Sequence, residues 1–111
     1  MNRFERLKLP KEFQLVYKRG KAAHAKSSVL FYLKGKECKK GFTASKKVGN
    51  AVYRNRAKRR LRALFMEFSP QMNNGTYVFV AKEPIRDTSY AMLKADIEKA
   101  LKRVGAMKDA S

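Results

Sequence analysis

Residues 38–66 carry ten basic side chains and no acidic one, a charge bias that limits how this part of the chain can fold. Apolar residues within the stretch recur at i, i+4, i+7, i+8 and i+11, the spacing of one face of an α-helix. These positions are Ala57, Leu61, Leu64, Phe65 and Phe68. Projected at about 100° per residue, basic side chains cover the remaining arc. The stretch therefore predicts a helix, opened by Gly49 and Asn50, with one side in the core and the other almost wholly cationic.

The whole chain shares this bias, because 27 Lys and Arg against 9 Asp and Glu among 111 residues give a formal net charge of +18. Solubility alone needs only about 2–8 charges on a small domain. Leu, Ile, Val and Phe make up about 23% of the residues, just above the ~20% below which a highly charged chain is expected to be disordered. We therefore expect one small folded domain that binds a polyanion, and nucleic acid is the commonest large polyanion in a cell.

Periodicity elsewhere predicts two further helices and three strands. The helices span residues 10–19, which begin with Pro10 and are followed by Gly20, and residues 90–104, which follow capping oxygens at positions 87–89. The strands span residues 27–34, 41–46 and 76–81, and a further short strand is expected between residues 20 and 27. The short polar connector favours a hairpin between the first two strands. The order helix–strand–strand–helix–strand–helix predicts an α/β (α+β) two-layer sandwich.

The chain is expected to form a single domain over residues 1–111, ordered from about 5 to 104, with a flexible tail at 105–111. Uninterrupted apolar runs reach only five residues, as at 29–33, whereas a membrane helix needs about 18. The first six residues lack the apolar core of an export signal, and the lone Cys38 excludes an internal disulfide. These features favour a cytoplasmic protein with neither a membrane partner nor a disulfide-linked one.

Residues suited to catalysis or metal binding are few. His24 is the only histidine and has no carboxylate or cysteine near it in the sequence, while Cys38 has basic neighbours but no obvious histidine partner. Asp96 and Glu98 alternate with lysines on a predicted helix and are interpreted as solvated ion pairs. The sequence also lacks a glycine-rich phosphate loop and a His/Cys ligand cluster. It therefore predicts a binding protein without catalytic or metal-ligating residues of its own.

The stretch from residue 44 to residue 61 resembles the signature of the bacterial ribonuclease P protein subunit. The hallmark of that family is an Arg-Asn-Arg element, present here as Arg54, Asn55 and Arg56. A Phe-Gln-x-Val-aromatic segment at 13–17, the apolar strands and the C-terminal helix follow in the family's order, so the resemblance covers residues 5–104. Some family members have a longer connector than the one at 35–40.

This resemblance implies a small sandwich with an unusual left-handed βαβ crossover, although about 98% of such crossovers are right-handed. It also implies a subunit of an endoribonuclease, a ribonucleoprotein hydrolase of tRNA processing that removes the 5′ leader of precursor tRNA and leaves a 5′-phosphate. In that family the RNA subunit carries out the cleavage with Mg²⁺, and the protein is non-catalytic. The implied partners are therefore the RNA subunit and precursor tRNA, and Mg²⁺ is expected with the RNA rather than with the protein alone.

The residues expected to bind the RNA subunit lie in and just before the predicted basic helix: Lys46, Lys47, Asn50, Arg54, Asn55, Arg56, Lys58, Arg59, Arg60 and Arg62. Arginine forks bind phosphate bidentately, and the first amides of a helix can add a phosphate site. By the resemblance, the cleft for the single-stranded leader contains Phe13, Tyr17 and Phe31, since aromatic faces stack on unpaired bases. From the residues alone, these three also fit a core, and Asn55 also fits a helix cap or a solvated surface.

Other classes of protein account for part of the pattern. A structural RNA-binding protein of ribosomal type, without a role in cleavage, explains the charge and size equally well but not the long signature. A cationic module for a membrane surface or for DNA compaction fits the charge but not the strands that are apolar on both faces. A protein-only nuclease is disfavoured because the sequence lacks the acidic cluster that would hold a catalytic Mg²⁺.

Overall fold

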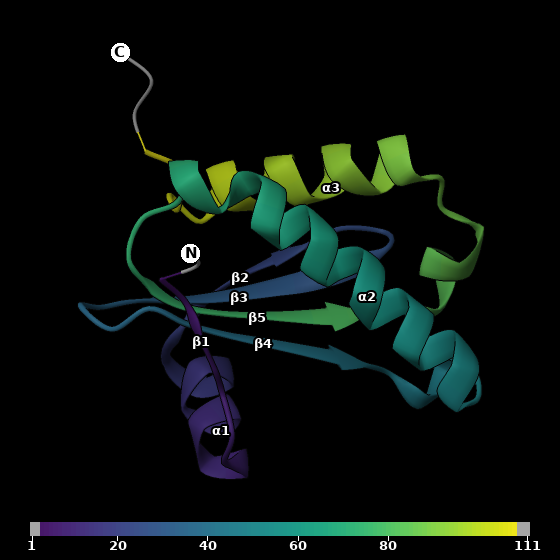
Figure 1. The fold of residues 1–111 in the computed structure, drawn as a ribbon, viewed down its shortest axis with the longest axis horizontal. Helices are drawn as coiled ribbons and strands as arrows, with labels where there is room; N and C mark the ends of the chain where they lie inside the picture. The colour runs from purple at the N-terminus through teal and green to yellow at the C-terminus, as the bar shows by residue number, and fades with distance from the viewer. Residues whose placement is uncertain (1–2, 109–111) are drawn as a thin grey trace.

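The computed structural model describes residues 3–108, in which α-helices pack against one mixed sheet (Figure 1). The helices are α1 (Pro10–Arg19), α2 (Ala51–Phe68) and α3 (Tyr90–Arg103). The strands are β1 (Glu5–Arg6), β2 (Lys21–His24), β3 (Ser28–Lys34), β4 (Lys39–Ala44) and β5 (Gly75–Ala81), and the 3₁₀ turns are η1 (Lys46–Val48), η2 (Ser69–Gln71) and η3 (Glu83–Asp87). The strand order across the sheet is β1-β4-β5-β3-β2. The expected α+β class is confirmed.

Strand β5 lies at the centre of the sheet and pairs with strands from both halves of the chain. It runs antiparallel to β3 and parallel to β4, so that Phe79 lies opposite both Leu30 and Phe42. The expected hairpin between residues 27–34 and 41–46 is therefore wrong, because β5 lies between those two strands. β5 is apolar on both faces and buried over most of its length, and the central position removes both faces and both edges from water.

The unit β4–α2–β5 is a parallel βαβ unit with a left-handed crossover. When α2 faces the viewer and both strands point upward, β5 lies to the left of β4 (Figure 1). This confirms the handedness that the family resemblance implied, against the usual preference. Between η1 and α2, Gly49 has φ +135°, a backbone conformation that other residues rarely adopt, so the turn into the helix depends on glycine.

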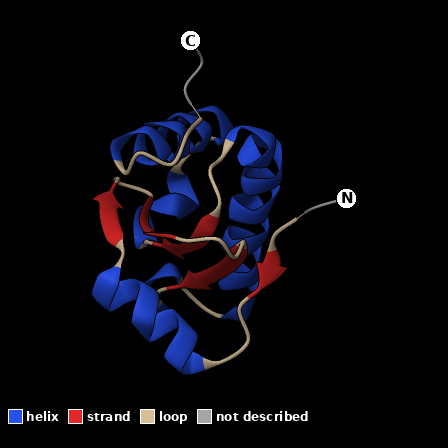
Figure 2. Cartoon of the chain, turned by 90° about the vertical axis from the view of Figure 1, so that its left-hand side faces the viewer, coloured by secondary structure: helices blue, strands red, loops and turns tan. Residues whose placement is uncertain are grey.

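Helices α2 and α3 cover one face of the sheet, and α1 lies on the other face (Figures 1 and 2). The main core forms between the sheet and α2 and α3, where Leu30 and Tyr32 of β3 meet Tyr77 and Phe79 of β5. The predicted apolar stripe of α2 is buried in full and belongs to this core: Ala57, Leu61, Leu64, Phe65 and Phe68. The predicted amphipathic helix is therefore confirmed, and its basic side faces outward.

Helix α1 has the predicted bounds, and both of its ends are fixed by local interactions. At its start, the Glu12 carboxylate accepts hydrogen bonds from the backbone amides of Leu9 and Lys8, at 2.9 and 3.1 Å. At its end, Gly20 has an ordinary extended conformation, so its role as a stop is steric rather than conformational. A Cβ at position 20 would lie 2.6 Å from the Val16 carbonyl oxygen and 2.9 Å from that of Tyr32. Glycine thus lets the chain turn directly from α1 into β2.

The boundaries of the other helices and strands match those predicted from the sequence, with two differences. The short strand expected between residues 20 and 27 is present as β2, and α3 begins after Ser89, whose hydroxyl accepts from the Met92 amide at 3.2 Å. The strand expected at 41–46 runs two residues earlier, because the Ser45 hydroxyl accepts from the Lys47 amide and starts η1. Strand β1 has no counterpart among the predicted elements, since two residues carry no periodic signal.

Part of the expected flexible tail packs against the domain. Ala106 is fully buried, and its carbonyl accepts from the Asn73 amide at 2.7 Å. Met107 pairs with Met72 in an isolated bridge, and the Lys108 amide donates to the Gln71 carbonyl. Residues 105–108 thus differ from the expectation, because apolar side chains and backbone bonds hold them against η2. The rest of the expected tail, residues 109–111, lies outside the described residues.

Candidate nucleic-acid interface

Helix α2 begins at a side-chain cap. The Asn50 side-chain oxygen accepts from the backbone amides of Val52 and Tyr53, at 3.1 and 3.3 Å, and so satisfies donors that a helix start leaves free. Asn50 was expected among the RNA-binding residues, but its oxygen serves the helix itself. The first amides of α2 are therefore partly occupied within the protein.

The outward side of α2 carries exposed polar and basic side chains. Seven of the ten residues expected to bind RNA are exposed to solvent: Lys46 and Lys47 on η1, Asn50 at the helix cap, and Asn55, Arg56, Arg59 and Arg62 on the helix itself. Asn55 lies one turn inside the helix and does not cap it. This leaves base or ribose recognition and simple solvation as the two roles for its side chain.

Two further cations, Arg54 and Lys58, lie with Arg62 on the flank of α2 that faces β4. Arg54 and Lys58 line a hollow with Phe42 and Thr43 of that strand, and the Arg62 guanidinium lies 5.4 Å from the Phe42 ring centroid. The Arg54 Nε is buried and has no hydrogen-bond partner within residues 3–108. Burial, with the positive charges of Arg62 and Arg6, also lowers the pKa of the nearby Lys40. This flank therefore concentrates positive charge beside an uncharged surface.

Arg60 has a different role from its neighbours on α2. Its guanidinium donates to the carbonyl oxygen of Ile85 at 2.9 Å and to that of Thr88, and so ties the helix to the end of η3. Burial, and to a lesser extent the charge of Arg56, lowers the pKa of Arg60. Arg60 was expected among the docking residues, but two of its donors are used inside the protein.

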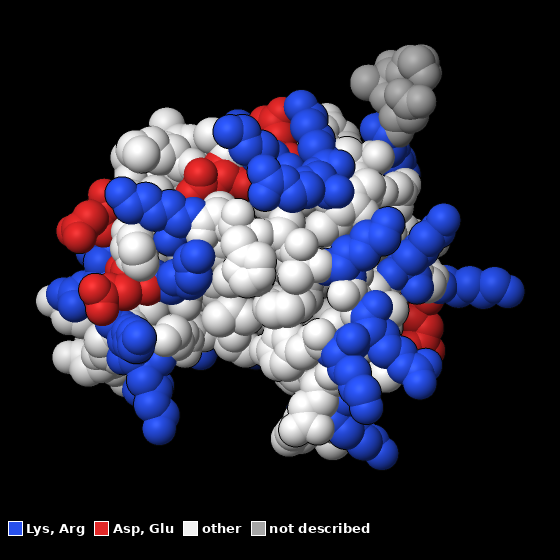
Figure 3. All heavy atoms as spheres, turned by 180° about the vertical axis from the view of Figure 1, so that it is seen from behind, with Lys and Arg blue, Asp and Glu red and all other residues white. Residues whose placement is uncertain are grey.

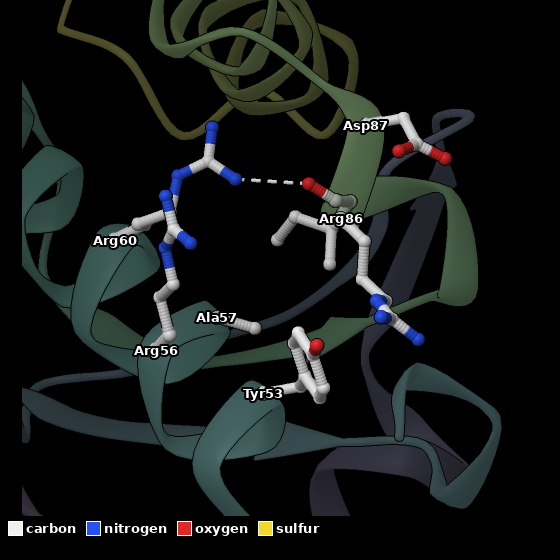
Figure 4. Close-up of a pocket in the computed structure, with 7 residues that line it drawn as sticks. Tyr53, Arg56, Ala57, Arg60, Arg86 and Asp87 are labelled. Carbon is white, nitrogen blue, oxygen red and sulfur yellow. Dashed lines mark hydrogen bonds between the residues drawn. The ribbon is translucent and has the colours of Figure 1, made fainter. Parts of the chain in front are cut away.

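Beside Arg60, a cavity of about 140 Å³ opens between α2 and η3 (Figure 4). Two residues that the sequence analysis did not single out line it, Tyr53 and Arg86. The Arg86 guanidinium lies over the Tyr53 ring, 3.7 Å from its centroid. An isolated arginine 33 positions further along the chain gives no sequence signal of this contact, because only the fold brings the two residues together.

The aromatic residues expected in the leader cleft lie on α1 and on β3, on the opposite face of the sheet. Tyr17 of α1 and Phe31 of β3 meet with 4.8 Å between ring centroids. Phe13, one turn before Tyr17, covers Gly41 of β4, where an added Cβ would lie 2.5 Å from the Phe13 ring. Tyr17 is 39% exposed, while Phe13 and Phe31 are half-buried. These side chains thus form a surface cluster rather than a closed core.

One side of the molecule combines uncharged surface with basic side chains (Figure 3). Seen from behind, uncharged residues form a central band, and Lys and Arg side chains border it on several sides (Figure 3). Unpaired bases can stack on aromatic rings while cations along the border neutralise the phosphates. Uncharged surface and basic side chains thus lie next to each other on this side of the molecule.

One ion pair, which the sequence analysis did not predict, holds α1 in place beside this face. The Lys39 ammonium donates to Glu12 Oε2 at 3.0 Å and so links α1 to β4. Hydrogen bonds from the Leu9 amide, from Lys39 and from the Lys8 amide together lower the pKa of Glu12 to about 2. A glutamate three residues after a helix start was the only signal of this anchor in the sequence.

The residues weighed for catalysis lie in unrelated surroundings. His24 is exposed on the edge strand β2, beside Asp96, Lys99 and Arg103 of α3. Cys38 is partly buried and packs against the main core just before β4. Within residues 3–108, no three His, Cys, Asp or Glu side chains are grouped so that they could hold a metal ion.

Comparisons with known proteins identify the family and the fold. The family model described as Ribonuclease P matches residues 1–105. The chain is 46% identical over 104 residues to the ribonuclease P protein component of Nitratiruptor sp. (94% of this chain, 95% of the relative) and 36% identical over 107 residues to that of Shouchella clausii (93% and 88%). Among solved structures, the RNase P protein of Staphylococcus aureus superposes with a TM-score of 0.82 at 28% sequence identity, and the match covers 93% of this chain and 97% of that one. The RNase P protein of Thermotoga maritima superposes with a TM-score of 0.78 at 25% identity, and the match covers 90% of this chain and 97% of that one.

Fold, charge and exposed aromatics together define a small α+β protein that binds RNA. Within residues 3–108, no helix is long and apolar enough to cross a bilayer. The chain belongs to the ribonuclease P protein family, and it is thus a protein subunit of that endoribonuclease. The resemblance seen in residues 44–61 is confirmed, and the comparisons do not favour the ribosomal alternative.

Proposed function

We propose that this subunit binds the RNA subunit of ribonuclease P through α2 and the single-stranded 5′ leader of precursor tRNA through the opposite face. The observation that carries the proposal is the separation of two surfaces by the sheet. One is the exposed cationic side of α2, and the other is the aromatic cluster of Phe13, Tyr17 and Phe31 beneath α1. A protein with two such surfaces can hold two RNAs at once, because it neutralises phosphates on both sides.

Docking on α2 rests on the arginines that reach solvent. Arg56 and Arg59 are exposed without a carboxylate partner among the ion pairs of residues 3–108, and arginine forks match phosphate oxygens bidentately. Arg54, Lys58 and Arg62 extend the contact toward β4, and Lys46 and Lys47 extend it before the helix. Asn50 contributes by capping α2, and Arg60 contributes by fixing η3.

In this proposal the RNA subunit carries out phosphodiester cleavage with Mg²⁺, and the protein positions the substrate. The ligands of that metal belong to the RNA in this proposal. The reaction that follows is hydrolysis of precursor tRNA to give a mature 5′-phosphate end. Processing of newly made bacterial tRNA implies the cytoplasm as its compartment.

Affinity purification of the protein from its native cell, followed by sequencing of the bound RNA, tests the proposal. We expect one dominant structured RNA together with tRNA precursors that still carry 5′ leaders. A parallel purification of a variant with both Arg56 and Arg59 changed to Ala controls for RNA retained by charge in general. Recovery of ribosomal RNA alone, equal for both proteins, would contradict the proposal and favour the ribosomal alternative.

A further inference from the structure

The cavity between α2 and η3 is lined by three arginines. Arg56 and Arg60 project from α2 and Arg86 from η3, and the cavity measures about 140 Å³ (Figure 4). The carboxylate at its rim belongs to Asp87, which lies across the cavity from Arg56 and Arg60 (Figure 4). None of the four side-chain ion pairs within residues 3–108 involves Asp87 or any of these arginines. The cavity therefore carries an excess of positive charge.

Two of the three guanidiniums are held in place by the protein. Arg60 donates to the carbonyl oxygens of Ile85 and Thr88, which uses two of the five donors of a guanidinium. The guanidinium of Arg86 lies over the Tyr53 ring, with its Cζ atom 3.7 Å from the ring centroid. The Tyr53 ring is itself packed against Gly49, where an added Cβ would lie 3.1 Å from Tyr53 Cδ2. Groups fixed in this way lose little conformational entropy when they bind a ligand.

Buried apolar side chains at the base of the cavity strengthen electrostatic interactions inside it. Ala57 and Ile85 line the cavity and are 3% and 1% exposed. Such apolar walls lower the local dielectric, and an anion placed among the arginines interacts with them more strongly than it would in water. Mutual repulsion among the guanidiniums is relieved at the same time.

We propose that this cavity, made by Arg56, Arg60 and Arg86, binds one phosphate group of the RNA that docks on α2. Guanidiniums of arginines that line one cavity can donate to the tetrahedral oxygens of a phosphodiester. A stacked base is the less suitable ligand, because Arg86 already occupies a face of Tyr53. Arg86 lies outside the Arg-Asn-Arg element, so the docking surface extends from α2 onto η3. The inference rests on the proposed docking of the RNA subunit.

Binding of inorganic phosphate to the free protein tests the cavity independently of any RNA. We expect phosphate to shift the side-chain Nε–Hε NMR signals of Arg56, Arg60 and Arg86, and to leave that of Arg103 on α3 unmoved. Arg86→Ala should remove the shifts at the other two arginines. Equal shifts at Arg103, or none at the three arginines, would overturn the proposal.

Titration of the RNA subunit with variants then tests the ligand. Arg86→Ala should weaken binding about tenfold and lower the salt dependence by about one phosphate contact, the loss of one charge-assisted contact. Arg86→Lys should restore only part of this, since lysine lacks the planar fork. Tyr53→Leu should resemble Arg86→Ala, and Tyr53→Phe should match the wild type. Thermal melts confirm that each variant is folded.

Controls distinguish this inference from the proposed function. Arg103→Ala removes the same charge from α3 and should leave RNA affinity unchanged. If the wild type does not bind the RNA subunit, the proposed function fails. If the wild type binds and Arg86→Ala and Arg103→Ala bind equally well, with and without precursor tRNA, only the cavity proposal fails. A loss of affinity for the RNA subunit alone supports the proposal, and a loss that appears only with precursor tRNA would overturn it.

Discussion

The ring of Tyr17 meets the ring of Phe31 edge to face, with 4.8 Å between centroids and 69° between planes. Tyr17 belongs to α1 and Phe31 to β3, so the contact exists only while α1 is seated on the sheet. Each ring limits the rotation of the other, yet Tyr17 remains 39% exposed. A fixed and partly open aromatic pair can accept a base without first being ordered.

Replacement of Tyr17 by Ala should therefore weaken the binding of leader-bearing precursor tRNA to the holoenzyme. We expect a loss of about 1–3 kcal/mol, the usual contribution of one stacked base. Mature tRNA lacks the leader and should bind nearly as well as to the wild type. Leu15→Ala is the matched control, because Leu15 is also exposed on α1 but lies outside the aromatic cluster. Equal losses for both ligands would show that the variant acts through folding and not through the leader.

The exposed arginines of α2 should each contribute a phosphate contact to assembly with the RNA subunit. Arg56→Ala and Arg59→Ala should each lower the slope of log K against log salt by about one. Both side chains are exposed, so neither change should destabilise the fold. The measurement is RNA-subunit affinity across a series of salt concentrations. Slopes that match the wild type in both variants would exclude this side of the helix as the docking surface.

Arg60 should behave differently, because its guanidinium holds two backbone carbonyls. Arg60→Ala leaves the carbonyl oxygens of Ile85 and Thr88 without this donor, and we expect a loss of about 1–3 kcal/mol in the free energy of unfolding. Arg59→Ala, at the neighbouring exposed position, should change that free energy by less than about 0.5 kcal/mol. Urea unfolding of the free protein compares the two. Equal stabilities would show that the bonds from Arg60 to η3 contribute nothing.

This contrast shows how far the sequence predicted the interface. Periodicity separated the buried stripe of α2 from its basic side, because burial of apolar residues repeats with the helix turn. It did not separate Arg60 from Arg56, since both are cations one turn apart on that basic side. Only the position of η3, 25 residues further along the chain, decides which of them finds carbonyl partners. The pair Tyr53–Arg86 escaped prediction for the same reason.

The sheet shows the same limit. Residues 76–81 were predicted as a strand from their β-branched and aromatic composition, which is a local property. Their place between β3 and β4 depends on pairing between distant segments, and a short connector favoured the hairpin that does not form. The left-handed crossover came from the family resemblance alone, since general rules of topology favour the opposite hand.

The link between Glu12 and its partners should make stability depend on pH in the acidic range. The pKa of Glu12 is lowered from 4.5 to about 2 in the folded protein. A lowered pKa means that the carboxylate stabilises the fold fully above about pH 4.5 and loses this effect as the pH falls toward 2. The difference in stability between the wild type and Glu12→Gln should therefore shrink steadily between pH 5 and pH 2. Thermal melts over that range measure it.

The variant Lys39→Met separates the contribution of Lys39 to the lowered pKa of Glu12 from that of the backbone amides. The hydrogen bond from the Leu9 amide is the largest cause of the lowered pKa, and that from Lys39 is the second. Loss of the lysine should therefore reduce the pH dependence without abolishing it. A pH profile for Glu12→Gln parallel to that of the wild type would refute the assignment of the effect to Glu12.

The last prediction concerns which subunit cleaves the phosphodiester bond. His24 and Cys38 lie in unrelated surroundings, and no metal-ligand cluster is found within residues 3–108, so the protein alone should not accelerate phosphodiester cleavage. Its contribution should be electrostatic, through neutralisation of repulsion between two RNAs. Added cations screen the same repulsion, and the RNA subunit alone should regain much of its activity when Mg²⁺ and monovalent salt are raised. A double variant, His24→Ala with Cys38→Ala, should leave the single-turnover rate of the holoenzyme unchanged. Specific cleavage of precursor tRNA by RNA-free protein, abolished in that double variant, would overturn the non-catalytic assignment.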